Sequence, residues 1–371
     1  MKHVNEGDNC VLRKSVVKNT RQNTSLLMDI ANWATNPRLQ FTELAIHEAR
    51  LCFIDTIACM TAGANQPPVR KAANAMQQAG ATGNSQTVLH GISLSAPAAA
   101  LVNGTAAHVL DYDDYEIPGS THPSAAIIPA LLAINDLSQS NYGQVMAGYL
   151  VGFETIVQIA QALVGYSHYM AGWHATSTIG SIGAAAASAY FLELPADKFA
   201  MALALSCSLS AGLKVQFGTE TKSLHAGLAA RAGVEAALLA QAGITANLDV
   251  LDGPYGFLAC YNGSPSKHAE ISLLSDTIES AMDHHGILRK PWPSCAYTHR
   301  VIEAALNHAS TPDFNPENIV SGIIRIPKPY FRVCHFLDPR TREEAQFSAL
   351  YCAASTLIDK ALVSQPGQLF N

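Results

Sequence analysis

The sequence predicts a mainly α-helical protein, and three observations support that class. Hydrophobic residues make up 49% of the 371 residues, but aromatic residues only 7%. An alanine-rich composition of this kind favours closely packed helices over sheets built from large aromatic and β-branched side chains. Apolar residues recur at helical spacing along most of the chain. Strand-like runs do not alternate with helices, which argues against a doubly wound nucleotide-binding sheet.

The helical pattern starts after a polar stretch. Residues 1–23 have neither apolar periodicity nor the apolar segment of a secretory signal, so we expect a disordered extension there. The first helix should begin beside a Thr/Ser cap, and the second should end near Gly63. Helices are expected, in chain order, at 24–34, 43–64, 69–79, 94–110, 124–136, 141–163, after the turn at 172–178, and at 196–212, 223–243 and 347–362.

A change in the sequence pattern near residue 264, from helical apolar runs to loops and β-branched runs, predicts a second, smaller domain. Residues 24–263 are expected to form a large all-helical domain, to which 356–371 return. Residues 264–355 mix loops with β-branched runs, and we expect a smaller α+β lid domain. Its clearest strand signal is IVSGIIRIPKP at 319–329, which should end at proline.

Composition excludes several classes of partner. Only 14% of residues are charged and the net charge is −6, without a Lys/Arg run that would suit nucleic acid or a membrane surface. No 18-residue window is free of polar interruption. The eight cysteines form no CxxC pair, and cysteines so scattered typically act as small buried hydrophobes in a reducing compartment. We therefore expect a soluble, cytoplasmic protein.

The segment HVLDYDDYEIPGSTHP at 108–123 concentrates acid in a chain with few charges. It holds Asp111, Asp113, Asp114 and Glu116, followed by His122. A solvated loop whose acids favour the start of the next helix is one interpretation. A helix N-terminus that offers free N–H groups to an anionic substrate is the other.

Two further segments combine histidine or lysine with small and hydroxyl residues. GWHATSTIGSIG at 172–183 places His174 before a Gly/Ala-rich helix, where a hydrogen-bonded core histidine is the alternative. LKVQFGTETKSLHAG at 213–227 places Lys214, Lys222 and His225 among apolar residues. Lys222 and His225 share one helical face, and a surface turn is the alternative.

The fourth segment is LRKPWPSCAYTHR at 288–300, where Lys290 precedes two prolines. Cys295 and His299 lack the surroundings of an acyl-transfer site. Together the four segments offer Lys and His to bind carboxylates and Asp/His pairs to move protons. They contain no phosphate loop, metal-ligand spacing or nucleophile elbow, so they favour proton transfer next to a carboxylate.

In this order the four segments resemble the MmgE/PrpD family. The matching runs are HVLDYDDYEIPGSTHPSAAIIPALLA, GWHATSTIGSIGAAAAS, FGTETKSLHAGLAARAGVEAALLAQAGIT, KPWPSCAYTH and RVCHFLDPRTREEAQFSALYCAA. The resemblance implies a large helical domain with an α+β lid, a homodimer, and an active site in the cleft between the domains. It also implies action on small di- or tricarboxylates without a cofactor or metal.

The resemblance also implies roles for individual residues. Asp111, His122, His174 and Lys222 match the family motifs D-[FY]-D-D, THP, G-[FW]-H and TK-x-[LM]-H, and are the expected catalytic residues. Lys222, His122 and Lys290, which opens the KP-x-PSC run, are expected to contact substrate carboxylates. Asp111 and His174 are expected to transfer protons.

Three more positions are expected to bind substrate. Tyr115 stands where the decarboxylase pattern has Thr, one residue further from His122, and the larger side chain should change which substrate fits. Lys214 resembles the epimerase-type sequences of the family. His225 closes the TK-x-[LM]-H motif.

These features predict a lyase that dehydrates or decarboxylates a small di- or tricarboxylate. An isomerase that epimerises iminodisuccinate or a similar acid is the alternative within the family. Family members usually continue beyond the FS-x-x-Y helix, whereas this chain stops at Asn371. A shortened, inactive member that serves only as an oligomer partner is therefore the third expectation.

Overall fold

The computed structural model describes residues 25–136, 141–163, 166–262 and 279–359, and the predicted extension at 1–23 lies outside them. The fold is mainly α-helical, as predicted. In chain order the α-helices are α1 Leu26–Ala34, α2 Glu43–Gly63, α3 Pro67–Gln78, α4 Ala96–His108, α5 Pro123–Asn135, α6 Tyr142–Ala162, α7 Tyr166–Met170, α8 Ala175–Phe191, α9 Ala196–Leu209, α10 Glu220–Gln241, α11 Phe257–Asn262, α12 Ala281–His285, α13 Ala296–Ala309, α14 Lys328–Phe331, α15 Arg342–Ala345 and α16 Ala349–Asp359. Single 3₁₀ turns are η1 Lys214–Gln216, η2 Leu248–Val250 and η3 Pro316–Asn318.

The helix starts follow the capping signals of the sequence. Ser25, Thr42 and Asn141 accept hydrogen bonds from backbone N–H groups in the first turns of α1, α2 and α6. These side chains satisfy N–H groups that the helix itself leaves without partners. Helix α2 ends at Gly63, as expected.

Helix α8 lies at the centre of the core and is buried along nearly its whole length. It contacts α5, α6, α9 and α10, so it has no solvent face and no amphipathic pattern. Its alanines and glycines allow this close packing. A Cβ on Gly183 would come within 2.3 Å of the Ile156 side chain on α6.

Helices α4 and α10 approach most closely at two glycines. A Cβ on Gly104 would lie 2.7 Å from the Cα of Gly227, and a Cβ on Gly227 would lie 2.2 Å from the carbonyl oxygen of Leu101. Real Cβ atoms do not tolerate such contacts, so the two backbones can meet only because both positions are glycine. This contact brings the C-terminal end of α4 next to the first turn of α10.

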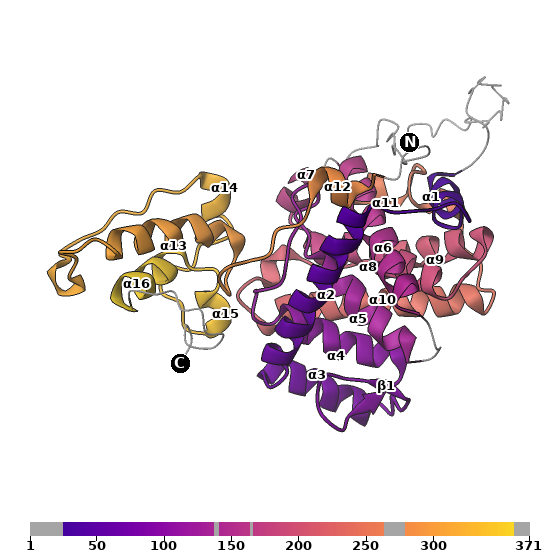
Figure 1. Ribbon diagram of the computed structural model, residues 1–371, viewed down its shortest axis with the longest axis horizontal. Helices are drawn as coiled ribbons and strands as arrows, with labels where there is room; N and C mark the ends of the chain where they lie inside the picture. The colour runs from indigo at the N-terminus through magenta and orange to yellow at the C-terminus, as the bar shows by residue number, and fades with distance from the viewer. Residues whose placement is uncertain (1–24, 137–140, 164–165, 263–278, 360–371) are drawn as a thin grey trace, which may run out of the picture.

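The described chain forms a large helical body and a smaller lid (Figure 1). The lid contains α13 to α16, and an extended segment at 286–295 leads into it from α12. Helix α12 lies within the range 264–355 predicted for the lid, but it packs on α6 and α2 of the body. Residues 356–359 continue α16, which packs on α13, and 360–371 lie outside the described residues.

The strand predicted at 319–329 is wrong. Residues 319–327 are extended, but no described segment pairs with them, and Lys328 begins α14. A β-branched run becomes a strand only when a neighbouring segment accepts its backbone hydrogen bonds. Among the described residues the only strands are β1 Ser85–Gln86 and β2 Ser93–Leu94, an antiparallel pair in the body. The β component expected of the lid is therefore absent from its described part.

The lid is held against the body near the end of α4. The side chains of Arg342 and Gln346 each donate a hydrogen bond to the carbonyl oxygen of Val109, at 3.3 Å. Arg342 also donates to the side-chain oxygen of Gln66. The Phe347 ring of the lid packs on the Phe217 ring of the body, with centroids 5.1 Å apart. These contacts join the lid to the body.

One described helix, α6, is long and apolar enough to cross a membrane by length and composition. However, 78% of its apolar window is buried inside the protein, where it packs on α8, α5 and α2. Burial of this extent is what a core helix shows.

Candidate active site

A cavity of about 690 Å³ lies between the body and the lid. The body contributes the loop between α4 and α5, the N-termini of α8 and α10, and Phe217. The linker contributes Leu288 and Lys290, and the lid contributes the start of α13 together with Tyr330 and Phe347. A cavity of this size suits a small organic acid with several polar contacts.

The acid-rich loop at 109–122 is buried rather than solvated, which overturns the first interpretation of that segment. Asp111, Asp113, Asp114 and Glu116 are each at most 2% exposed. Glu116 closes the loop on itself, because its carboxylate accepts hydrogen bonds from Gly119 N and from the N–H and hydroxyl groups of Thr121, at 2.6–2.9 Å. Burial raises the pKa of Glu116, although these donors oppose the shift.

Two residues of this loop have left-handed backbone conformations. Asp111 has φ 49° and Ser120 has φ 54°, and both line the cavity. Non-glycine residues adopt this region at a cost, and such strain is found most often where side chains are held for function.

Asp111 forms the floor of the cavity together with two lysines. Its Oδ1 accepts hydrogen bonds from Lys222 Nζ and Lys290 Nζ, each at 2.8 Å, and Lys290 also donates to the Asp111 carbonyl oxygen. All three side chains are at least nine-tenths buried. Among the described residues, Asp111 Oδ2 has no hydrogen-bond partner. The group carries two positive charges and one negative charge, so it favours an additional anion.

Protonation within this group follows from the charges. Burial alone would raise the pKa of Asp111, but Lys222 and Lys290 outweigh it and hold that pKa below its usual range. Burial would likewise lower the pKa of Lys290, but Asp111 reverses the shift and raises it. Asp111 therefore remains a carboxylate and Lys290 an ammonium at any physiological pH.

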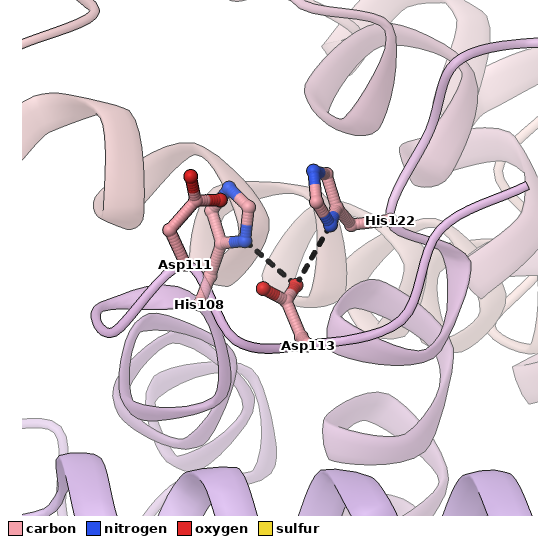
Figure 2. A group of neighbouring side chains, drawn as sticks. All are labelled: His108, Asp111, Asp113 and His122. Carbon is pink, nitrogen blue, oxygen red and sulfur yellow. Dashed lines mark hydrogen bonds and ion pairs between the residues drawn. The ribbon is translucent and has the colours of Figure 1, made fainter. Parts of the chain in front are cut away.

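Asp113 lies between two histidines. Its Oδ2 is 2.7 Å from His108 Nδ1 and 3.3 Å from His122 Nδ1 (Figure 2). Burial would raise the pKa of Asp113, but His108 and His122 together lower it well below the ordinary value. His122 Nδ1 also donates to the Asp114 carbonyl oxygen at 2.8 Å. Because Nδ1 is engaged, Nε2 of His122 is the nitrogen left for the cavity.

Asp114 has the opposite protonation state. Burial raises its pKa to about 8, although the hydroxyl of Ser124 donates to its Oδ2 at 2.5 Å and opposes the shift. Ser124 also shares a hydrogen bond with the Tyr149 hydroxyl. Asp114 thus acts as a neutral core group that anchors the loop to α5 and α6.

His122 and His174 occupy equivalent positions at two helix starts. Each is the N-cap residue, His122 of α5 and His174 of α8, and His122 N donates to Thr176 Oγ1 at 3.1 Å. His174 Nδ1 lies 3.0 Å from His225 Nδ1. Burial, and secondarily Lys222, lowers the pKa of His174 well below the ordinary value. His174 is therefore a neutral imidazole.

One donor atom from each of His108, Asp111, Asp113 and His122 lies within 4.8 Å of the others, a spacing that could hold a metal ion. However, both lysine ammonium groups lie 2.8 Å from Asp111 Oδ1 and would repel a divalent cation. The imidazoles of His108 and His122 already pair with Asp113. The group therefore fits an anion-binding network better than a metal site.

Six of the eight side chains predicted from the sequence line this cavity: Asp111, Tyr115, His122, His174, Lys222 and Lys290. The other two, Lys214 and His225, are not among its lining residues. Lys214 Nζ donates to the Tyr169 carbonyl oxygen at 2.7 Å and lies 4.0 Å from the centre of the Tyr169 ring. His225 lines a second cavity on the far side of His174.

The structure adds lid residues that are not among the eight predicted site residues. Arg300, Tyr297 and Tyr330 line the cavity from the lid, and the two tyrosine rings stack with centroids 4.2 Å apart. Arg300 has no acidic partner within the described ranges. Helical spacing could have found it, because Arg300 follows Tyr297 by three residues and ends the segment 288–300 that contains the KP-x-PSC run.

Family comparison agrees with this arrangement. Residues 28–270 match the MmgE/PrpD N-terminal domain, and residues 292–366 match the MmgE/PrpD C-terminal domain. The boundary between the two matches lies near the crossing from body to lid. Residues 356–366 fall in the C-terminal match.

Individual relatives are cis-aconitate decarboxylases. The mouse protein is 32% identical over 275 residues, which are 71% of this chain and 55% of the mouse protein. The human protein is 32% identical over 70% of this chain and 55% of its own length. The Aspergillus terreus protein is 27% identical over 91% of this chain and 73% of its own length. The chain thus spans about half the length of the mouse and human relatives. With both domain matches in order and the cavity between them, the chain belongs to the MmgE/PrpD family.

Proposed function

We propose that the protein is a lyase that decarboxylates a small tricarboxylate resembling cis-aconitate. The observation that carries this proposal is the pair Lys222 and Lys290, which share one carboxylate oxygen of Asp111 and face the same cavity as Arg300. Cations at both the floor and the lid suit a substrate with carboxylates at both ends. The names of the mouse, human and fungal relatives support the choice of reaction.

The protonation states are compatible with decarboxylation, in which a substrate carbon must gain a proton. Asp111 has a lowered pKa because of its two lysines, so it is a weak base. His174 is neutral and keeps one ring nitrogen for the cavity. A neutral imidazole N–H can donate a proton to a developing carbanion or enolate. His174 can therefore supply the proton that decarboxylation requires.

The reaction can be written with these groups. The bond from carbon to the departing carboxylate breaks, and its electron pair forms a new double bond and spreads toward a second carboxylate. Lys222 and Lys290 stabilise the negative charge that develops there. The carbon at the far end of the former double bond takes a proton from His174, and CO₂ leaves. Asp111 holds both ammonium groups in place throughout.

Proton NMR in D₂O tests the proposal, with cis-aconitate, 2-methylcitrate and iminodisuccinate supplied separately. We expect cis-aconitate to be consumed, with new terminal-alkene signals and one deuterium incorporated into each product molecule. Loss of water from 2-methylcitrate would instead establish a dehydratase. Deuterium at the Cα of iminodisuccinate without net loss of substrate would establish an epimerase. A folded protein that turns over none of them would support an inactive family member.

A matched pair of lysine variants tests the site itself. Lys222→Met should lower kcat/KM by about 100-fold or more, since it removes a buried charge that contacts the reacting acid. Lys71→Met should leave kcat/KM unchanged, because Lys71 forms an exposed ion pair with Glu220 outside the cavity. Equal activities of the two variants would remove the lysine pair from the mechanism.

A further inference from the structure

The pair His174 and His225 lies between two cavities. His174 lines the cavity between body and lid, and His225 lines a second cavity of about 290 Å³. Their Nδ1 atoms are 3.0 Å apart, within hydrogen-bond distance. The two residues are 2% and 4% exposed, so both are buried.

The second cavity reaches the protein surface. It is lined by the hydroxyl residues Ser177 and Ser181 and by the ion pair Arg231–Glu235, whose side chains are 39% and 31% exposed. Although most of its wall is apolar, these hydroxyl and charged groups give water polar partners in the cavity that His225 lines. The first cavity, by contrast, is filled by substrate during the reaction.

The proposed reaction consumes a proton in every turnover, because a bond from carbon to carboxylate is replaced by a bond from carbon to hydrogen. A neutral His174 that gave up its Nε2 proton alone would become an imidazolate, so a proton must reach its Nδ1 in the same step, while the substrate still occupies the first cavity. His174 has only its Nδ1 side available for this purpose, and that side faces His225.

We infer that His225 is a relay residue that passes protons from the second cavity to His174. Water in the second cavity gives a proton to His225 Nε2 and is left as hydroxide, His225 Nδ1 passes its proton to His174 Nδ1, and His174 Nε2 gives its proton to the substrate carbon. One proton enters the chain and one leaves it, so charge and atoms balance. The tautomers reset after product release. Water in the first cavity gives a proton to His174 Nε2, the shared proton returns from His174 Nδ1 to His225 Nδ1, and His225 Nε2 returns its proton to the hydroxide in the second cavity. The hydroxide left in the first cavity exchanges into bulk solvent, so the net proton comes from solvent.

The chemistry of the pair fits this role. Burial, and secondarily Lys222, lowers the pKa of His225 to about 4, and His174 is also neutral. Two neutral imidazoles at this distance share one hydrogen, because one nitrogen donates while the other accepts. Position is secured by the backbone, since His174 N donates to the Gly212 carbonyl oxygen at 3.0 Å and Ser177 Oγ to the His225 carbonyl oxygen at 3.3 Å.

The inference rests on the proposed decarboxylation, and glutamine at position 225 tests it. The amide of His225→Gln can still donate to His174 Nδ1, which keeps the tautomer, but it cannot relay a proton. We expect kcat to fall by about tenfold or more with KM little changed, and the solvent isotope effect on kcat to rise. His168→Gln is the control, because His168 is a buried histidine that lines neither cavity. A normal kcat and isotope effect in His225→Gln would overturn the relay.

Rescue of kcat by small molecules distinguishes a relay role of His225 from a purely positioning role. Imidazole should restore part of the kcat of His225→Ala, whereas 1-methylimidazole, which has one blocked nitrogen, should not. Equal rescue by both compounds would leave His225 only a positioning role and overturn the relay.

Nitrogen-15 NMR of labelled histidines examines the pair without any turnover. It should show a coupling across the shared hydrogen between His174 and His225 in the wild-type protein. An absent coupling overturns the relay alone. An inactive wild-type protein that shows the coupling would instead overturn the proposed function.

Discussion

Neighbouring carboxyl groups of one loop take opposite protonation states. Asp111 and Asp113 have lowered pKa values because lysines or histidines contact them, whereas Asp114 has a pKa of about 8 because burial is opposed only by hydroxyl and backbone donors. All three are fully buried, so burial alone does not distinguish them. The nearest partner decides which group stays charged.

Asp114 should make folding stability depend on pH. Its folded pKa of about 8 lies above the ordinary value of 3.8, so between these values the native state holds a proton that the unfolded state has lost. Its stabilising contribution is full below about pH 4 and is lost as the pH rises through 8. Relative to Asp114→Asn, the wild-type protein should lose up to about 1.4 kcal/mol of unfolding free energy per pH unit across this window.

Urea unfolding of both proteins at pH 5, 6, 7 and 8 measures this difference. Groups such as His108, whose pKa burial lowers to about 3, are present in both proteins and cancel in the comparison. Parallel stability curves for the two proteins would show that Asp114 is ionised in the folded state.

At the scale of elements, the site depends on how closely two helices approach. The end of α4 leads into Asp111, and the first turn of α10 carries Lys222. The glycine contact between Gly104 and Gly227 sets the spacing of these helices. The ion pair at 2.8 Å between Asp111 and Lys222 is therefore a consequence of backbone packing deeper in the core.

Gly227→Ala should destabilise the protein and weaken catalysis together. The new methyl group would meet the Leu101 carbonyl oxygen at 2.2 Å and Thr105 Oγ1 at 2.5 Å, neither of which can move without separating the helices. Overpacking of this kind costs about 1–3 kcal/mol of unfolding free energy, or more. Thermal and chemical unfolding, together with kcat/KM for cis-aconitate, measure both effects.

The matched control is Gly143→Ala at the exposed start of α6. Its new methyl group would contact only the Asn141 side chain, at 3.3 Å. Alanine is the better helix former, so this variant should be as stable as the wild-type protein or up to about 1 kcal/mol more stable. Equal losses of unfolding free energy in both variants would mean that the α4–α10 contact is no more sensitive to an added methyl group than an exposed helix start.

At the scale of the whole molecule, the cavity is complete only when body and lid are together. The body supplies Lys222 and the two N-cap histidines, whereas the lid supplies Arg300 and the stacked tyrosines. A substrate with separated carboxylates can therefore contact both parts at once. Such a ligand would also favour the closed arrangement, since its charges bridge the two parts.

Arg300→Gln should reduce discrimination between acids. We expect binding of tricarballylate, which has three carboxylates, to weaken by up to about fivefold, because an exposed arginine contributes about 1 kcal/mol at most to a third contact. Binding of glutarate, which has two carboxylates, should change by less than about twofold. Isothermal titration calorimetry measures both constants.

Arg325→Gln serves as the control, because Arg325 is an exposed lid arginine that does not line the cavity. It should bind both acids as the wild-type protein does. An equal loss of affinity for both acids in Arg300→Gln would mean that Arg300 attracts any anion through its charge and does not recognise the third carboxylate.

Much of the fold could be predicted because helices depend on local spacing and capping. Ser25, Thr42 and the stop at Gly63 are signals within one turn of the helix end they control. The absence of a strand at 319–329 could not be predicted in this way. The β-branched residues of this segment show a local preference, but a strand also requires a partner, and the described residues supply none.

The sequence by itself determined the long helices of the body, the family and six of the side chains that line the cavity, because these depend on residue types at short and fixed spacings. It did not predict α13 of the lid. Only the tertiary structure decided which groups are charged and which touch. Asp111 meets Lys222 and Lys290 across 111 and 179 residues, and His174 meets His225 across 51. Protonation depends on distance and burial in space. The order of the motifs along the chain gives neither the distances between these groups nor their burial.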